Sequence, residues 1–194
     1  MPTAALESVL LTATIDAREE HGVTTIDIPN PFFQTIIEHE EYCVVMHLRG
    51  KLSDLMVKVV PKIYTKCVTI TSKGETILYV RLIGALYVII NSTLLYYKLF
   101  VKNPKSIGFA LNPYDPFVAN KMVRVKHLTV FWPVDDLKVG HHETSVVTEM
   151  AEWLKKTYAR ILYYLSVAMT LHCGKIHNYI GMNLGYSVIR EVKI

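Results

Sequence analysis

The sequence predicts an α+β fold in which antiparallel strands pack against helices. Short runs of β-branched and aromatic residues are separated by brief turns, which is typical of strands joined as hairpins. The segment 144–158 instead spaces apolar residues such as Met150 and Leu154 at helical intervals. With 194 residues, of which 51% are hydrophobic, the chain is long enough to bury a core, and we predict one domain over residues 1–194.

The expected elements follow in chain order. Residues 4–20 begin with a short helix or strand and end in a charged loop, Asp16 to Glu20. After a strand over 23–28, Asn30 caps a helix whose first residue is Pro31, a position that proline tolerates well. The remaining expected elements are strands at 44–48, 57–60, 67–70 and 77–80, a helix at 84–101, turns at Asn103-Pro104 and Asn112-Pro113, strands at 128–134 and 137–139 that end at Gly140-His141, and the helix at 144–158.

The composition restricts the partners and the cellular compartments that fit this protein. A net charge of +4 suits a phosphate-bearing partner but is also common among ordinary proteins. The three cysteines are widely spaced and predict buried free thiols in a reducing compartment. No secretory signal is visible, so we expect an intracellular protein, cytoplasmic or nuclear. The uncharged run 82–97 is too short to span a membrane, so no membrane partner is expected.

Three carboxylates are the main candidates for chemistry. Asp135 and Asp136 stand where an apolar strand stops, and Asp27 stands near the end of a β-branched run far earlier in the chain. Paired divalent metals need such hard oxygen ligands, although an acidic solvated turn is the alternative for the first two. One aspartate after a first strand and two at a later hairpin tip is the arrangement of polymerase palm domains, in which two metal ions lie about 4 Å apart.

Five segments, in order, resemble the sequence blocks of copia-type LTR-retrotransposon reverse transcriptases. Together they extend from residue 25 to about residue 182, which is most of the chain. The segments are Thr25-Ile26-Asp27 and onward to Thr35, Ala85-Leu86-Tyr87 with Ser92 and Tyr96-Tyr97-Lys98, Asn112 to Asn120, Trp132 to Lys138, and Lys175 to Met182.

The resemblance implies a palm-like antiparallel sheet packed on helices and an RNA-directed DNA polymerase activity. It implies Asp27 and Asp135 as the main ligands of two Mg²⁺ ions, with Mn²⁺ as a possible substitute and a weaker contribution from Asp136. The expected partners are an RNA or DNA template, a DNA or RNA primer and deoxynucleoside triphosphates.

The resemblance also assigns roles around the incoming nucleotide and the primer. Phe32 would lie under the nucleotide sugar, although core packing with Ile36, one helical turn on, is an equal alternative for its ring. Asn91 stands where the family has glutamine beside the nucleotide. Tyr179 and Gly181 belong to the segment that supports the primer terminus. Arg81, Lys98 and Lys138 are either phosphate contacts or ordinary surface cations.

Several departures from the family pattern leave a second function open. Val88 and Ile90 replace a glycine and a basic residue, and Pro133 precedes the aspartate pair, where proline is disfavoured in a central strand. Few residues precede Asp27, so we expect truncated fingers. The chain is therefore either a polymerase domain or an inactive palm-fold remnant that binds nucleic acid or proteins. Adjacent histidines at 141 and 142 point to opposite strand faces and are not expected to share a metal.

Overall fold

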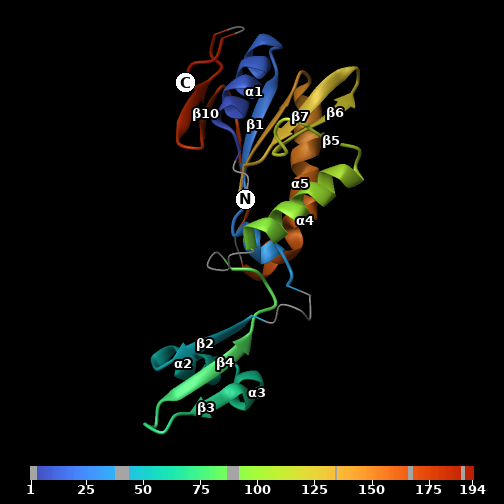
Figure 1. Ribbon diagram of the computed structural model, residues 1–194. Helices are drawn as coiled ribbons and strands as arrows, with labels where there is room; N and C mark the ends of the chain where they lie inside the picture. Colours follow the sequence, from blue (N-terminus) through green and yellow to red (C-terminus); the bar gives the residue numbers. More distant parts are fainter. Residues whose placement is uncertain (1–3, 38–43, 87–91, 134, 166–167, 189–190) are drawn as a thin grey trace. The chain divides into compact units, whose positions relative to one another are not determined.

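The computed structural model describes residues 4–37, 44–86, 92–133, 135–165, 168–188 and 191–194 (Figure 1). The chain divides into two compact units. Unit 1 comprises residues 1–35 and 86–194, and unit 2 comprises residues 36–85 between them. Both units combine helices with antiparallel strands, which confirms the predicted α+β class. The boundaries of a single domain over 1–194 stay a prediction.

Unit 1 is built around a six-stranded sheet with the strand order β5-β6-β7-β8-β1-β9. A separate hairpin pairs β10 with β11. The elements of unit 1 are α1 (Leu6–Arg18), β1 (Gly22–Asp27), η1 (Pro31–Gln34), α4 (Ser92–Ser106), β5 (Ala110–Leu111), β6 (Val118–Val123), β7 (Lys126–Phe131), β8 (Asp136–His141), α5 (Thr144–Leu165), β9 (Thr170–Cys173), β10 (Ile176–Tyr179) and β11 (Met182–Gly185).

Two helices cover opposite faces of this sheet. Asp16 of α1 contacts Lys138 and lies where a side chain at Gly140 would project. Helix α1 therefore covers the face of the sheet to which positions 138 and 140 of β8 point. Thr144, at the start of α5, lies beside Gly22, whose side of β1 is the other face. Strand β8 is consequently buried on both sides from Leu137 to His141. This central position explains why β8 is almost free of exposed residues.

Unit 2 is a three-stranded antiparallel sheet with the order β2-β4-β3, accompanied by short helices (Figure 1). Leu78 on the central strand is fully buried, as are Ser53 and Ala85. The elements of unit 2 are β2 (Val45–Arg49), α2 (Lys51–Val59), α3 (Pro61–Tyr64), η2 (Thr65–Cys67), β3 (Val68–Ile70) and β4 (Thr76–Arg81).

Many expected elements are confirmed. The strand at 23–28 corresponds to β1, the strand at 44–48 to β2, and the two strands around Gly74 to the β3–β4 hairpin. The hairpin that carries the aspartate pair is formed by β7 and β8, which pair from Thr129 to Phe131. The helix at 144–158 is present and continues to Leu165.

Several expectations were wrong. The predicted strand at 57–60 belongs to α2, where Leu52, Leu55 and Val59 follow helical spacing. The predicted turn at Asn103-Pro104 lies inside α4, and Gly140-His141 continues β8 instead of ending it. Asp16 is a buried residue of α1 rather than part of a charged loop.

Local details at Asn30 and at two cysteines also differ from expectation. Asn30 precedes η1, a single 3₁₀ turn, but its side chain makes no capping hydrogen bond and its φ is +50°. Cys67 is partly exposed and Cys173 is exposed, so neither is the buried thiol that was predicted, while Cys43 lies outside the described residues. The helices of the described ranges include none that is long and apolar enough to cross a membrane.

Candidate functional site

Antiparallel pairing brings the predicted carboxylates to one end of the larger sheet. In the β1–β8 ladder, Asp27 is the direct partner of Asp136. Directly opposed residues in such a ladder project from the same face of the sheet, with Cβ atoms about 5 Å apart. Asp135 stands next to this pair, and its carbonyl oxygen accepts a 3.1 Å hydrogen bond from the amide of Ile28. Residues separated by more than a hundred positions in sequence thus meet at one sheet end.

The three carboxylates interact electrostatically. Burial and then the charge of Asp135 raise the pKa of Asp27. Burial, followed by the charges of Asp135 and Asp27, raises the pKa of Asp136. Asp135 therefore acts on both of the others. A cation placed among these groups would relieve this repulsion and lower both pKa values.

The tip between β7 and β8 accommodates the unusual proline. Strand β7 ends at Phe131, and the amide of the buried Trp132 donates to the carbonyl oxygen of Phe117, 3.0 Å away. Pro133 follows this last bond and lies outside the ladder. Its missing N–H therefore removes no bond from the sheet, which answers the objection that proline is disfavoured in a central strand.

The β10–β11 hairpin contacts the carboxylate end of the sheet through Tyr179. The hydroxyl of this buried tyrosine donates to the carbonyl oxygen of Asp136 at 3.2 Å. Burial and the charge of Asp136 hold the pKa of the Tyr179 phenol well above its usual value, so it remains a donor. The chain then reverses through Ile180 and Gly181, which have φ values of +51° and +73°. Glycine suits this left-handed geometry, which strains an isoleucine.

A second contact ties the same hairpin to β1. The side chain of His177 is fully buried, and its Nδ1 lies 3.2 Å from the hydroxyl of Thr25. Its Nε2 lies 2.9 Å from the carbonyl oxygen of Gly174, which can only accept, so Nε2 carries the proton. Burial lowers the pKa of this imidazole, which favours its neutral form. Sequence reasoning missed this residue because its partner is distant in sequence.

Of the two residues predicted to contact the nucleotide, one is described by the structure. Phe32 is 5% exposed, and its ring packs edge-to-face on Tyr96 with the ring centroids 5.8 Å apart. The ring is thus packed in the core, as the alternative supposed, but against Tyr96, whereas Ile36 is 53% exposed. Asn91, with its neighbours Val88 and Ile90, lies outside the described residues.

Lys138 is not a phosphate contact. Its side chain is 2% exposed and forms an ion pair with the equally buried Asp16 of α1. Asp16 also accepts a 2.9 Å hydrogen bond from Nδ1 of His21. Burial alone would raise the pKa of Asp16, but the charge of Lys138 and the hydrogen bonds from His21 and Lys138 outweigh it and lower the pKa. The alternative of an ordinary surface cation is also wrong for Lys138, whereas Arg81 and Lys98 are exposed.

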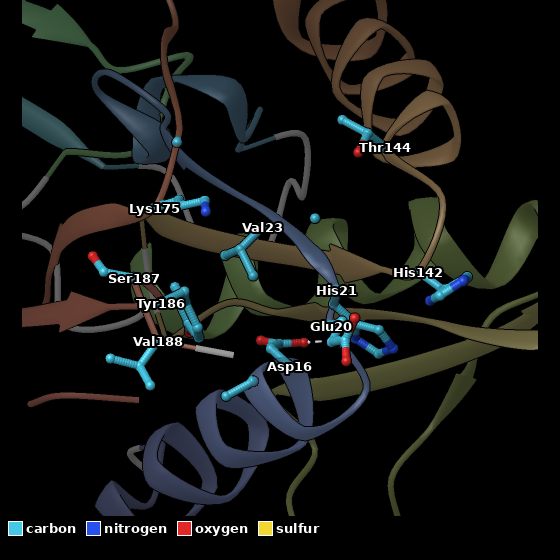
Figure 2. Close-up of a pocket in the computed structure, with 13 residues that line it drawn as sticks. Asp16, Glu20, His21, Val23, His142, Thr144, Lys175, Tyr186, Ser187 and Val188 are labelled. Carbon is cyan, nitrogen blue, oxygen red and sulfur yellow. Dashed lines mark hydrogen bonds and ion pairs between the residues drawn. The ribbon is translucent and has the colours of Figure 1, made fainter. Parts of the chain in front are cut away.

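A cavity of about 330 Å³ adjoins this buried ion pair (Figure 2). Asp16 and His21 face it from α1 and the loop before β1, and Tyr186 faces it from the segment after β11 (Figure 2). Thr144 and Lys175 also line it. Because acidic and basic groups line it together, the cavity shows no preference for a ligand of one charge.

The chemistry of the three carboxylates, though not their present arrangement, fits magnesium. Mg²⁺ is bound through carboxylate oxygens, and the pKa values of Asp27 and Asp136 are raised first by burial and then by the negative charge of their neighbours. Within the described ranges, however, no group of three or more His, Cys, Asp or Glu side chains is arranged to hold a metal ion. The backbone register brings the ligands together, and their side chains would need to turn toward a shared ion.

The described residues define an α+β protein with antiparallel sheets and carboxylates gathered at one end of the larger sheet. No protein-family model matches the chain, and no curated protein matches it. Among solved structures it is similar to apo telomerase from Candida tropicalis, with 11% sequence identity and a TM-score of 0.48. The match covers 99% of this chain and 36% of that chain. The function proposed below therefore rests on the residues and geometry of this chain.

Proposed function

We propose that this chain is a polymerase palm-like domain that transfers deoxynucleotides to a primer 3′-hydroxyl on an RNA or DNA template. The single observation that carries the proposal is the direct pairing of Asp27 with Asp136, beside Asp135. The order of the five sequence blocks supports the finer assignment to a copia-type reverse transcriptase. A retrotransposon origin and an intracellular site of action belong to this same proposal.

The three aspartates would together coordinate the metal ions. Asp27 and Asp135 would supply the main carboxylate oxygens, because the charge of Asp135 bears on both of the other carboxyl groups. Asp136 would contribute less, as the resemblance implies, and its backbone is held by the hydrogen bond from Tyr179. Two bound Mg²⁺ ions, or Mn²⁺ in their place, would activate the 3′-hydroxyl and stabilise the charge of the leaving group.

The remaining residues would position the substrates. Tyr179 and Gly181 would support the primer terminus, and the contact between Tyr179 and Asp136 supports a connection between that hairpin and the carboxylates. Phe32 and Asn91 would stand beside the incoming deoxynucleotide. For Phe32 this role requires that an edge of its packed ring be reached by the sugar.

A primer-extension assay tests the proposal. The wild-type chain is incubated with poly(rA)·oligo(dT), dTTP and either Mg²⁺ or Mn²⁺, beside Asp135→Asn. A matched control is Asp54→Asn, which removes an exposed aspartate of α2. We expect extension by the wild type and the control, and a loss of at least about 100-fold in Asp135→Asn, because a metal ligand supplies several kcal/mol of transition-state stabilisation. Equal extension by all three proteins, or none by the wild type, contradicts an active polymerase.

An inactive remnant of the palm fold, acting at most as a nucleic-acid or protein binding module, is the second candidate. Two observations favour it: the carboxylates are not arranged around a common ion, and Phe32 is packed in the core. The same assay separates the two candidates. A remnant would retain any template binding while extending no primer with either metal.

A further inference from the structure

We propose that the solvent-facing side of the unit 2 sheet binds single-stranded nucleic acid. This side, called the open face, consists of Val45, His47 and Arg49 on β2 and Tyr79 and Arg81 on β4. The proposal concerns residues outside the carboxylate site and requires neither metal nor catalysis. It therefore stands or falls separately from the proposed polymerase activity.

The burial pattern shows why this face is open. Along β2, exposed residues alternate strictly with half-buried ones, and Val45, His47 and Arg49 are the exposed set. On β4, Tyr79 and Arg81 are exposed, while Leu78 is completely buried. Neighbouring strand residues point to opposite faces, and α2 contacts both β2 and β4. The helices thus cover the side that holds Leu78. On the other side Ile77, the ladder partner of Arg49, is still buried, whereas Tyr79 and Arg81 face solvent.

Two ring side chains stand together on the open face. His47 and Tyr79 are direct partners in the β2–β4 ladder, and their ring centroids are 6.4 Å apart with an interplanar angle of 41°. Tyr79 is 47% exposed, which is a large exposure for an aromatic residue on a strand. Aromatic and histidine rings on a sheet provide surfaces on which unpaired bases stack, and stacking tolerates any base sequence.

Cations flank the two rings. Arg81 lies two residues from Tyr79 on the same face, and Arg49 lies two residues from His47 on the adjacent strand. Both arginines are exposed. Residues 44–85 carry seven Lys or Arg and only two Asp or Glu residues, so this part of the chain is more basic than the rest. Rings flanked by exposed guanidinium groups match a ligand that alternates bases with phosphates.

The chemistry selects an unpaired strand over a duplex. In a duplex the bases are already stacked and paired, so their faces are unavailable to His47 and Tyr79. A flat protein partner would also leave the arginines without the regularly spaced negative charges of a polynucleotide. The occupant that uses both features is an extended single strand, of RNA or DNA, lying across β2 and β4.

Fluorescence anisotropy with the full chain tests this assignment. The probes are labelled 12-mers of dT and rU and a 12-base-pair duplex, in EDTA so that metal-dependent binding is absent. The variants are Tyr79→Ala, Tyr79→Phe and the double variant Arg49→Gln/Arg81→Gln. The matched controls are Tyr114→Ala, which removes a 96% exposed tyrosine of unit 1, and Lys58→Gln/Lys62→Gln, which removes two exposed charges from the helices of unit 2. Far-UV circular dichroism checks that each variant is folded.

We expect the wild type to bind at least one of the single strands more tightly than the duplex. Tyr79→Ala should weaken that binding by about tenfold, Tyr79→Phe should retain it, and the controls should change it less than about threefold. The double arginine variant should reduce the slope of log affinity against log salt by about 1.4, because two phosphate contacts are lost. Duplex binding as tight as single-strand binding, or unchanged affinity in folded Tyr79→Ala, overturns the proposal.

Discussion

The hydroxyl of Tyr179 donates a hydrogen bond to the main-chain carbonyl oxygen of Asp136, 3.2 Å away. Because Asp136 is also the ladder partner of Asp27, this bond joins the β10–β11 hairpin to the strand ends that carry the carboxylates. The hairpin and the six-stranded sheet form separate ladders, so side-chain contacts such as this one connect them. Both contacts described above, from Tyr179 and from His177, come from β10.

Removing the Tyr179 hydroxyl should cost little stability but still be measurable. In Tyr179→Phe the ring remains in its buried place and the hydroxyl is lost, with its bond to the carbonyl oxygen of Asp136 and its longer 3.5 Å contact with that of Phe131. We therefore expect a decrease of about 1 kcal/mol in the free energy of unfolding. Urea denaturation measures this value. Tyr114→Phe, at a 96% exposed tyrosine, is the control and should be unchanged. Equal stability of the two variants would show that the bond to Asp136 contributes nothing.

Breaking the buried ion pair between Lys138 and Asp16 should be among the most costly single changes. Among the residues that the structure describes, Lys138→Met leaves the buried carboxylate with His21 as its remaining partner, and we expect a loss of about 3–5 kcal/mol. The double variant Asp16→Leu/Lys138→Met should be more stable than the single one, because no charge is left unpaired. Lys155→Met breaks an exposed pair with Glu152 and should cost less than about 1 kcal/mol. A similar loss at positions 138 and 155 contradicts the buried pair.

The same pair predicts a loss of stability in acid. Since the pKa of Asp16 is lower in the folded protein than in the unfolded chain, its ionised form stabilises the fold above the unfolded pKa of about 4. That contribution disappears as the pH falls through the folded pKa. Thermal unfolding followed from pH 6 to pH 2 should show a steeper decline for the wild type than for Asp16→Asn. Parallel profiles of the two proteins would rule out this linkage.

For the carboxylate site we predict the opposite pH dependence of stability. The pKa of Asp136 is raised by burial and by the charges of Asp135 and Asp27, so its ionised form destabilises the metal-free protein at neutral pH. Protonation of Asp136 removes this repulsion, so its stabilising effect on the fold is fully present below the unfolded pKa. The effect is lost as the pH rises through the folded pKa. Asp136→Asn should therefore stabilise the protein at pH 7 in EDTA, by about 0.5 kcal/mol after solvent screening, and not at pH 3. The control Asp54→Asn should give no such gain. If Asp136→Asn instead destabilises the protein at pH 7, the proposed repulsion among the three carboxylates is refuted.

A methyl group at position 140 should disturb the interior. The Cβ of an alanine there would collide with the carboxylate of Asp16, which is fixed by its ion pair and cannot move aside easily. We expect Gly140→Ala to lower the free energy of unfolding by about 1–3 kcal/mol, as overpacking does. At Gly185 a Cβ would meet its nearest neighbour at an ordinary 3.7 Å, so Gly185→Ala is the matched control. Comparable stabilities for the two alanine variants would be inconsistent with the close packing of Asp16.

Local sequence patterns predicted the strands and hairpins whose formation depends on neighbouring residues. The strand that ends at Asp27 and the hairpin that carries Asp135 were visible from β-branched runs and turn residues. Residues 57–60 were misjudged because three valines and a lysine favour a strand by propensity alone, whereas the helical spacing over the whole of α2 determines the outcome.

Partners that are distant in sequence could not be predicted. Asp16 looked like part of a charged loop because its neighbours are charged, and only folding shows that Lys138 neutralises it. The same limit applied to His177, whose partner Thr25 lies on another strand. For the carboxylates, sequence indicated which residues would meet, and the ladder register then showed that Asp27 is paired directly with Asp136.

The most direct test of the proposed metal site is anomalous diffraction from crystals soaked with Mn²⁺ and a non-hydrolysable deoxynucleoside triphosphate. We predict anomalous peaks at about 2.1 Å from carboxylate oxygens of Asp27 and Asp135, the distance of small divalent ions from oxygen ligands. Carboxylates that point apart with no peak between them, or a peak confined to another part of the protein, would contradict it.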